Sequence, residues 1–254
     1  MTRMHSIIFG AAALLLTSSA ALAQSFDHSH AAFTEVLKTH VQGSKVDYAA
    51  LKKSPAKLNT YLDTLAAVKK SDYAKWNRNQ QMAFLINLYN AATLKLVIDH
   101  YPVTSIRRIG GLLRSPWKMD VVRMFGDMVT LDHVEHDVLR PNFNEARIHF
   151  AVNCASIGCP DLRNEAFRAA DLERQLEEQT RAFLSDRSRN HFDARGNTLH
   201  LSPIFKWYEE DFVKKSGSVE KYVAPYLDAA ARKAIQGGGV RVRNTNYDWS
   251  LNKR

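Results

Sequence analysis

Residues 81–100 constrain the fold most, because apolar side chains occupy nearly every direction around this segment. A helix with apolar residues on all sides is typically buried on most of its surface. Pro102 follows the segment and is expected to end the helix. The rest of the chain must therefore enclose it, and we predict that this helix forms the centre of a folded domain.

Two amides, Asn87 and Asn90, interrupt this apolar segment and share one helix face. A buried amide without a partner costs on the order of 1 to 3 kcal/mol, so each must be hydrogen-bonded. Either the two amides bind neighbouring backbone groups, or they line a cavity and orient a substrate or a catalytic group. The sequence leaves both interpretations open.

The other predicted elements are helices and hairpins rather than alternating strands and helices. Apolar periodicity and turn residues predict helices at 26–41, 51–65, 133–139, 169–184, 203–212 and 219–235, hairpins at 121–131 and 191–201, and strands at 148–152 and 240–243. This order indicates an α+β fold. We expect a mainly helical single domain with a small antiparallel sheet or hairpins around the buried central helix.

Residues 1–23 have the pattern of a signal peptide, with Arg3, an apolar run over 7–16 and an Ala-Leu-Ala site ending at Ala23. The run is short for a membrane span, and no later segment is expected to reach the roughly 20 apolar residues that spanning requires. Residues 24–254 are then expected to form one globular domain, periplasmic or secreted.

Basic residues give the chain a formal net charge of +9 at pH 7, but they are scattered along the sequence. Scattered charge usually marks a solvated surface, and an exported protein rarely meets nucleic acid. We expect a small-molecule or peptide ligand and no nucleic acid, with at most a weak attraction to anionic envelope surfaces.

Both cysteines, Cys154 and Cys159, lie in residues 147–163. The apolar residues 148–152 predict a buried strand, and the turn-forming residues after Cys154 place both sulfurs in a tight loop. In an oxidising compartment the pair is most simply a disulfide, worth about 2 kcal/mol. Alternatively, Cys154 is a nucleophilic or redox thiol whose pKa is lowered by nearby cationic or imidazole groups, or it is a buried cysteine without a chemical role.

Three other titratable side chains are candidates to act with Cys154. His149 is closest in sequence, but five residues away on a regular strand it would point to the opposite face. His136 and Glu135, on the predicted helix 133–139, offer a second imidazole and an acid. His133 and His136 are three residues apart on this short helix, but without a third ligand they are only a weak signal for a metal site. We therefore predict no metal and no cofactor.

Lys206 and Trp207 belong to a strongly aromatic predicted helix, with Ser202 as its cap and Pro203 in its first turn. Their side chains either face a pocket or pack in the core, and core packing is the commoner use of such aromatic residues.

Five separated motifs, at residues 84–94, 133–140, 147–160, 204–208 and 247–252, together resemble the family catalogued as domain of unknown function 547. The resemblance extends over essentially all of residues 24–254 and implies that the motifs form one module. It implies no reaction. It does imply that one set of residues should be tested together: Asn87, Glu135, His149, Cys154 and Lys206.

Three functions are compatible with these residues. The first is a thiol-dependent hydrolase or acyl transferase that acts on an amide or acyl substrate in the envelope, with Cys154 as nucleophile, His149 or His136 as base and Glu135 as orienter.

The second is a non-catalytic binding module for an envelope ligand. It has a structural Cys154–Cys159 disulfide and a pocket lined by Asn87, Asn90, Lys206 and Trp207. The third is a redox protein that cycles the Cys154–Cys159 pair.

Overall fold

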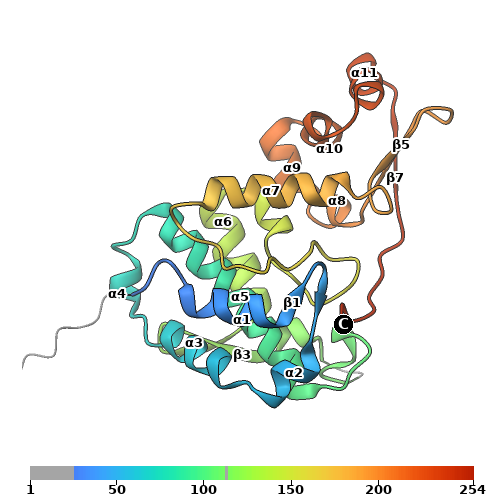
Figure 1. Ribbon diagram of the computed structural model, residues 1–254. Coiled ribbons are helices and arrows are strands. Elements are labelled where there is room, and N and C mark those ends of the chain that lie inside the picture. Colours follow the sequence, from blue (N-terminus) through green and yellow to red (C-terminus); the bar gives the residue numbers. More distant parts are fainter. Residues whose placement is uncertain (1–25, 112–113) are drawn as a thin grey trace, which may run out of the picture.

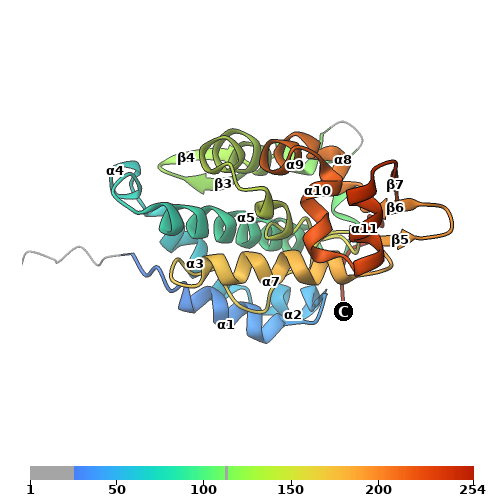
Figure 2. The ribbon, with the colours of Figure 1, turned by 90° about the horizontal axis from the view of Figure 1, so that it is seen from above.

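Helix α5 (Arg78–His100) runs through the middle of the computed structural model, which describes residues 26–111 and 114–254 (Figure 1). Figure 2 shows α5 between α7 and the β3–β4 hairpin. This arrangement confirms a mainly helical α+β fold around a buried central helix. The predicted signal peptide at residues 1–23 lies outside the described residues.

The side chains of α5 explain its central place. Asn77 and Gln80 form a capping box at its start, and nearly every residue from Met82 to Ile98 is buried. By length and composition α5 is able to cross a membrane, contrary to our expectation that no segment after the signal peptide reaches that length. However, 89% of the apolar 18-residue stretch of α5 is buried inside the fold, as in the core helix of a folded domain.

Short N-terminal elements cover one side of α5. They are α1 (Ala31–His40), β1 (Val41–Gln42), β2 (Lys45–Val46), α2 (Tyr48–Lys53), α3 (Ala56–Ala66) and α4 (Lys70–Tyr73). The single helix predicted over 51–65 is in fact α2 and α3, separated at Pro55, because proline lacks the N–H that a continuous helix requires.

The segment after α5 contains η1 (Ile106–Arg108), η2 (Pro116–Lys118) and the predicted hairpin, formed by β3 (Asp120–Met124) and β4 (Asp127–Thr130). The helix predicted over 133–139 is present as the π-helix η3 (His133–Leu139). It does not end at Leu139 as predicted, although Pro141 follows. It continues into α6 (Arg140–Phe143), because proline is tolerated in a first helical turn.

Residues 148–152 are not a strand, so this prediction is wrong. They belong mostly to the 3₁₀ helix η4 (Ala146–Phe150), and the Glu145 carboxylate accepts the Arg147 N–H at its start. Phe150 is fully buried in a second apolar cluster, where it packs against Phe183. Tertiary packing of this kind overrides the β-branched composition of a short run.

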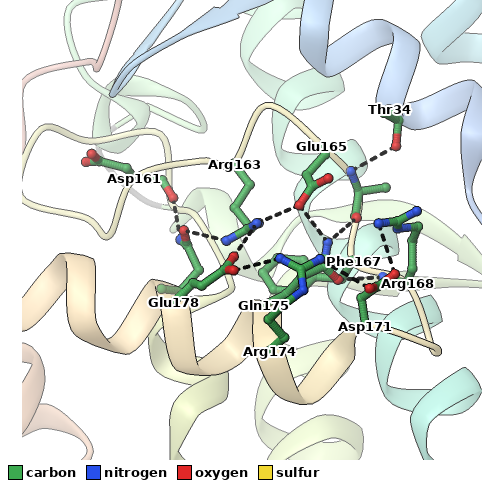
Figure 3. Close-up of polar contacts among 12 residues, drawn as sticks. Thr34, Asp161, Arg163, Glu165, Phe167, Arg168, Asp171, Arg174, Gln175 and Glu178 are labelled. Atoms are coloured by element: carbon green, nitrogen blue, oxygen red, sulfur yellow. Dashed lines mark hydrogen bonds and ion pairs between the residues drawn. The ribbon is translucent and has the colours of Figure 1, made fainter.

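The chain between the cysteine loop and α7 (Leu172–Ser185) is fastened to that helix by polar contacts (Figure 3). Arg163 donates to Glu165 and to Glu178, and the Arg168 N–H donates to the Gln175 side chain. This irregular segment is therefore held in one position although it has few regular backbone hydrogen bonds of its own.

The C-terminal part contains β5 (His191–Asp193), β6 (Thr198–Leu201), α8 (Ile204–Trp207), α9 (Glu209–Ser216), α10 (Val219–Val223), η5 (Ala224–Tyr226), α11 (Ala229–Gly237) and β7 (Arg241–Asn244). The helices predicted over 203–212 and 219–235 are each divided, the first at Tyr208 and the second near Pro225. The hairpin over 191–201 is confirmed. The strand predicted over 240–243 is also present, but it pairs parallel to β6, so this sheet is mixed rather than antiparallel.

After β7 the tail returns to the cysteine loop. The Ile157 N–H donates to the Ser250 carbonyl and the Gly158 N–H to the Asp248 carbonyl, at 2.9 and 2.8 Å. A Cβ on Gly158 would lie 2.9 Å from the Tyr247 ring, so this close approach requires glycine. The tail thereby carries its aromatic side chains onto the cysteine loop.

Candidate active site

A hollow of about 220 Å³ lies where the cysteine loop, η3, α8 and the tail meet. Its lining contains every residue predicted to be catalytic: Glu135, His136, His149 and Cys154. Aromatic side chains from distant parts of the chain complete it: Tyr89, Trp117, Trp207, Tyr208, Tyr247 and Trp249.

The central helix α5 holds the cysteine loop through hydrogen bonds of the Asn90 side chain. The Asn90 amide donates to the Ala151 carbonyl at 3.0 Å and accepts the Asn153 N–H at 2.8 Å. The Asn153 side chain in turn accepts the Ala155 N–H and donates to the Pro160 carbonyl. These buried bonds give the loop one defined shape.

The backbone beside Cys154 has an uncommon conformation. Ala155 has a φ of 58°, in the left-handed region that residues other than glycine seldom adopt. The side-chain bonds of Asn153 hold this turn in place. Such local strain often occurs where a reactive side chain must be presented.

The Cys154 sulfur lies among hydrogen-bonding groups. The Tyr247 and Ser156 hydroxyls are each 3.2 Å from it, and the Cys159 sulfur is 2.6 Å away. The contact with Cys159 lowers the pKa of Cys154, and the two hydroxyls act in the same direction against the opposing effect of burial. Burial raises the pKa of Cys159 well above its usual value, so Cys154 is the more readily ionised thiol.

The two sulfurs are unbonded in the structure. Their 2.6 Å separation exceeds the roughly 2.05 Å of an S–S bond, but the loop places them close enough to be joined by a small movement. Cys159 is buried, whereas Cys154 is partly accessible. The predicted disulfide stays a prediction.

His149 is completely buried and its ring stacks on Tyr208, with 3.8 Å between the ring centroids. Its Nε2 lies 2.6 Å from Oδ2 of Asp211, so Nε2 carries the proton and donates a hydrogen bond to this carboxylate. Nδ1 is then an acceptor. It has no hydrogen-bond partner, and neither has Glu135 Oε1, 3.9 Å away.

The electrostatics keep this imidazole neutral. Burial lowers the pKa of His149, although Asp211 and Glu135 both favour its protonated form. Burial alone would raise the pKa of Asp211, but hydrogen bonds from His149 and Arg140 outweigh it and hold that pKa well below its usual value. The sequence predicted Glu135 as the orienter of an imidazole, but the carboxylate bonded to His149 is Asp211.

His136 is arranged differently. Its Nδ1 lies 2.9 Å from Nη1 of Arg140, which can only donate. Nδ1 of His136 is thus occupied as an acceptor, and a neutral ring carries its proton on Nε2. Of the two histidines considered, His149 is the one with an unoccupied acceptor nitrogen in the hollow.

Of the four predicted binding residues, three do not line the hollow. Asn87 pairs with the Phe167 carbonyl and N–H, and Asn90 with the cysteine loop, so both amides brace backbone and neither lines the hollow. Lys206 is exposed and borders a separate surface depression. Trp207 alone of the four lines the hollow, with 47% of its surface exposed at the rim.

Sequence reasoning missed several groups that complete the site. Asp211 lies 62 residues from His149 in the chain, within a Glu-Glu-Asp run that resembles an ordinary solvated helix start. Tyr247 lies 93 residues from Cys154 in the chain, and its hydroxyl contacts the Cys154 sulfur. Within residues 26–111 and 114–254, no three His, Cys, Asp or Glu side chains gather closely enough to hold a metal ion.

Part of the chain matches a known protein family. Residues 73–184 match the family described as Protein of unknown function, DUF547. The resemblance expected from the motifs is confirmed, but over this region and not over residues 24–254. Cys154, His149 and Glu135 lie inside the matched region, whereas Asp211 and Tyr247 lie outside it. No curated protein and no solved structure matches the chain.

Proposed function

We propose that this chain, similar to the DUF547 family over residues 73–184, is a thiol-dependent hydrolase or acyl transferase whose nucleophile is Cys154. One observation carries the proposal: a partly accessible thiol of lowered pKa shares a hollow with a neutral imidazole that has an unoccupied acceptor nitrogen. A nucleophilic thiol and a positioned base are the two groups that acyl transfer through cysteine requires.

In the proposed reaction, Cys154 Sγ attacks the carbonyl carbon of an amide or ester. The C–S bond forms, the bond to the nitrogen or oxygen leaving group breaks, and His149 Nδ1 passes the thiol proton to that leaving group. Water or another nucleophile, deprotonated at Nδ1, then attacks the thioester and releases the thiol. Asp211 acts as the positioning residue, because it fixes the tautomer of His149.

Acylation by p-nitrophenyl acetate tests this proposal. We expect the reduced full-length protein to acquire an acetyl group on Cys154, mapped by peptide mass spectrometry. Cys154→Ser should abolish the adduct, Cys159→Ser should retain it, and His149→Gln should slow its formation roughly 100-fold, as for loss of a general base. An adduct on Cys159 alone, or none on folded protein, would refute the proposal.

The 2.6 Å separation of the sulfurs favours a second candidate, a redox protein that cycles the pair. The accessible Cys154 thiolate would attack the disulfide of a partner, and Cys159 would then displace the partner's thiol, so that the partner is reduced as the pair is oxidised. Equilibration in glutathione buffers separates the possibilities. A potential well above about −300 mV supports cycling, whereas a lower one indicates a structural disulfide, as in the binding-module interpretation.

We also propose that the protein is exported to the periplasm or secreted, since residues 1–23 have the signal-peptide pattern. N-terminal sequencing of the protein recovered from the envelope fraction should begin at Gln24. Recovery of an intact N-terminus from the cytoplasm would contradict export.

A further inference from the structure

We infer that the hollow around Cys154 binds its substrate through an alkylammonium group, held against Glu135 between aromatic side chains. The term substrate rests on the proposed function, but the inference about the ligand class rests on the hollow itself. Three features support a cationic ligand: the aromatic walls of the hollow, its unpaired carboxylate oxygen, and the absence of lysine and arginine from its lining as far as the described residues show.

The aromatic walls come from four separate parts of the chain. Trp207 packs with Tyr247 and Trp249 at one side, with ring centroids 4.8 and 5.7 Å apart. Trp117 meets Trp249 edge to face at 5.8 Å. Indole and phenol faces attract cations through their quadrupoles, and indole does so most strongly.

Trp249 already accepts a cation in this structure. The Arg107 guanidinium lies over its ring, 5.1 Å from the ring centroid. Arg107 belongs to a neighbouring depression and does not line the hollow. The contact shows that a ring of this cluster is oriented so that a cation can approach its face.

The carboxylates give the hollow a negative character. Glu135 is 3% exposed, and its Oε1 has no hydrogen-bond partner, although an unsatisfied buried acceptor is costly. Asp132 also lines the hollow. A ligand N–H⁺ donor in the hollow would supply the missing hydrogen bond to Glu135.

Among the described residues, lysine and arginine side chains act on these carboxylates only from outside the hollow. Among its described lining residues there is no lysine or arginine, in a chain of net charge +9. Arg140, the nearby guanidinium, is bonded to Asp211 and His136. An anionic ligand would therefore meet two carboxylates and no free cation, which is unfavourable.

Binding of three small probes tests the inference on full-length Cys154→Ser protein, so that no chemistry at Cys154 intervenes. The probes are n-butylammonium, n-butanol and butyrate, which share an alkyl chain and differ in charge. Calorimetry or tryptophan fluorescence gives their affinities at pH 7. We expect n-butylammonium to bind roughly tenfold or more tightly than n-butanol, because hydrogen bonds to charged groups are the stronger ones, and butyrate to bind most weakly.

Variants of two carboxylates locate the effect. Glu135→Gln should remove most of the preference for the ammonium probe, whereas the matched Glu210→Gln, on the exposed surface of α9, should leave it unchanged. Trp207→Leu, at the exposed rim, should weaken ammonium binding by roughly two- to fivefold through loss of a cation–π contact. This rim variant keeps the test decisive if Glu135→Gln does not fold.

Equal or tighter binding of n-butanol or butyrate would overturn the inference, as would an undiminished ammonium preference in folded Glu135→Gln or, if that variant does not fold, an unchanged ammonium affinity in Trp207→Leu. Acetylation of Cys154 is a separate readout. An ammonium preference without acetylation would refute the proposed thiol chemistry but support the cation site. Acetylation without an ammonium preference would refute the cation site but support the thiol chemistry.

Discussion

Asn90 and Asn87 provide a matched pair of substitutions that tests how α5 supports the site. Asn90→Leu leaves the buried Ala151 carbonyl and the Asn153 N–H unpaired, and Asn87→Leu does the same to both backbone groups of Phe167. Each unpaired group costs about 1–3 kcal/mol. Allowing for the apolar surface that leucine buries, each variant should lose about 2–4 kcal/mol of unfolding free energy.

The two variants should differ in their effect on Cys154, because only Asn90 holds the cysteine loop. Urea unfolding followed by tryptophan fluorescence measures stability, and the rate of iodoacetamide alkylation against pH measures the thiol. We expect Asn90→Leu to slow alkylation at pH 7 roughly tenfold, since a displaced loop loses about one hydrogen bond to the thiolate. Asn87→Leu should change the rate less than twofold.

Two results would refute this reasoning. An unchanged alkylation profile in folded Asn90→Leu would show that the amide does not position Cys154. Equal slowing in Asn87→Leu would show that loss of stability, rather than loop geometry, controls the thiol.

Three further predictions concern other parts of the fold. Burial lowers the pKa of His30 from 6.5 to about 4, so the stability that its neutral imidazole contributes is fully present above pH 6.5 and is lost as the pH falls to about 4. The free energy of unfolding should fall by about 3 kcal/mol over that pH range. Its dependence on pH, measured by urea unfolding, should be flatter in His30→Gln. Gly158→Ala should destabilise the protein by about 1–3 kcal/mol in the same assay, because the new Cβ meets the Tyr247 ring, whereas Gly237→Ala, with open space around it, should not destabilise it. Asp211→Asn should slow acetylation of Cys154 by at least tenfold with little change in p-nitrophenyl acetate affinity, and an unchanged rate would remove Asp211 from the proposed positioning role.

The amino-acid sequence determined the parts of this fold that depend on local pattern. Apolar residues on every side of α5 required burial, and alternation around turn residues predicted the β3–β4 and β5–β6 hairpins. The small residues after Cys154 placed both sulfurs in a loop. These features follow from side-chain periodicity and turn chemistry over a few residues.

Only the tertiary structure decided how the candidate site is assembled. Residues 148–150 belong to the 3₁₀ helix η4 and not to a strand, because Phe150 packs in the second apolar cluster. Asp211 reaches His149, and Tyr247 reaches Cys154, across 62 and 93 residues of chain. Such contacts depend on how separate apolar faces pack against one another, and no local pattern encodes that arrangement.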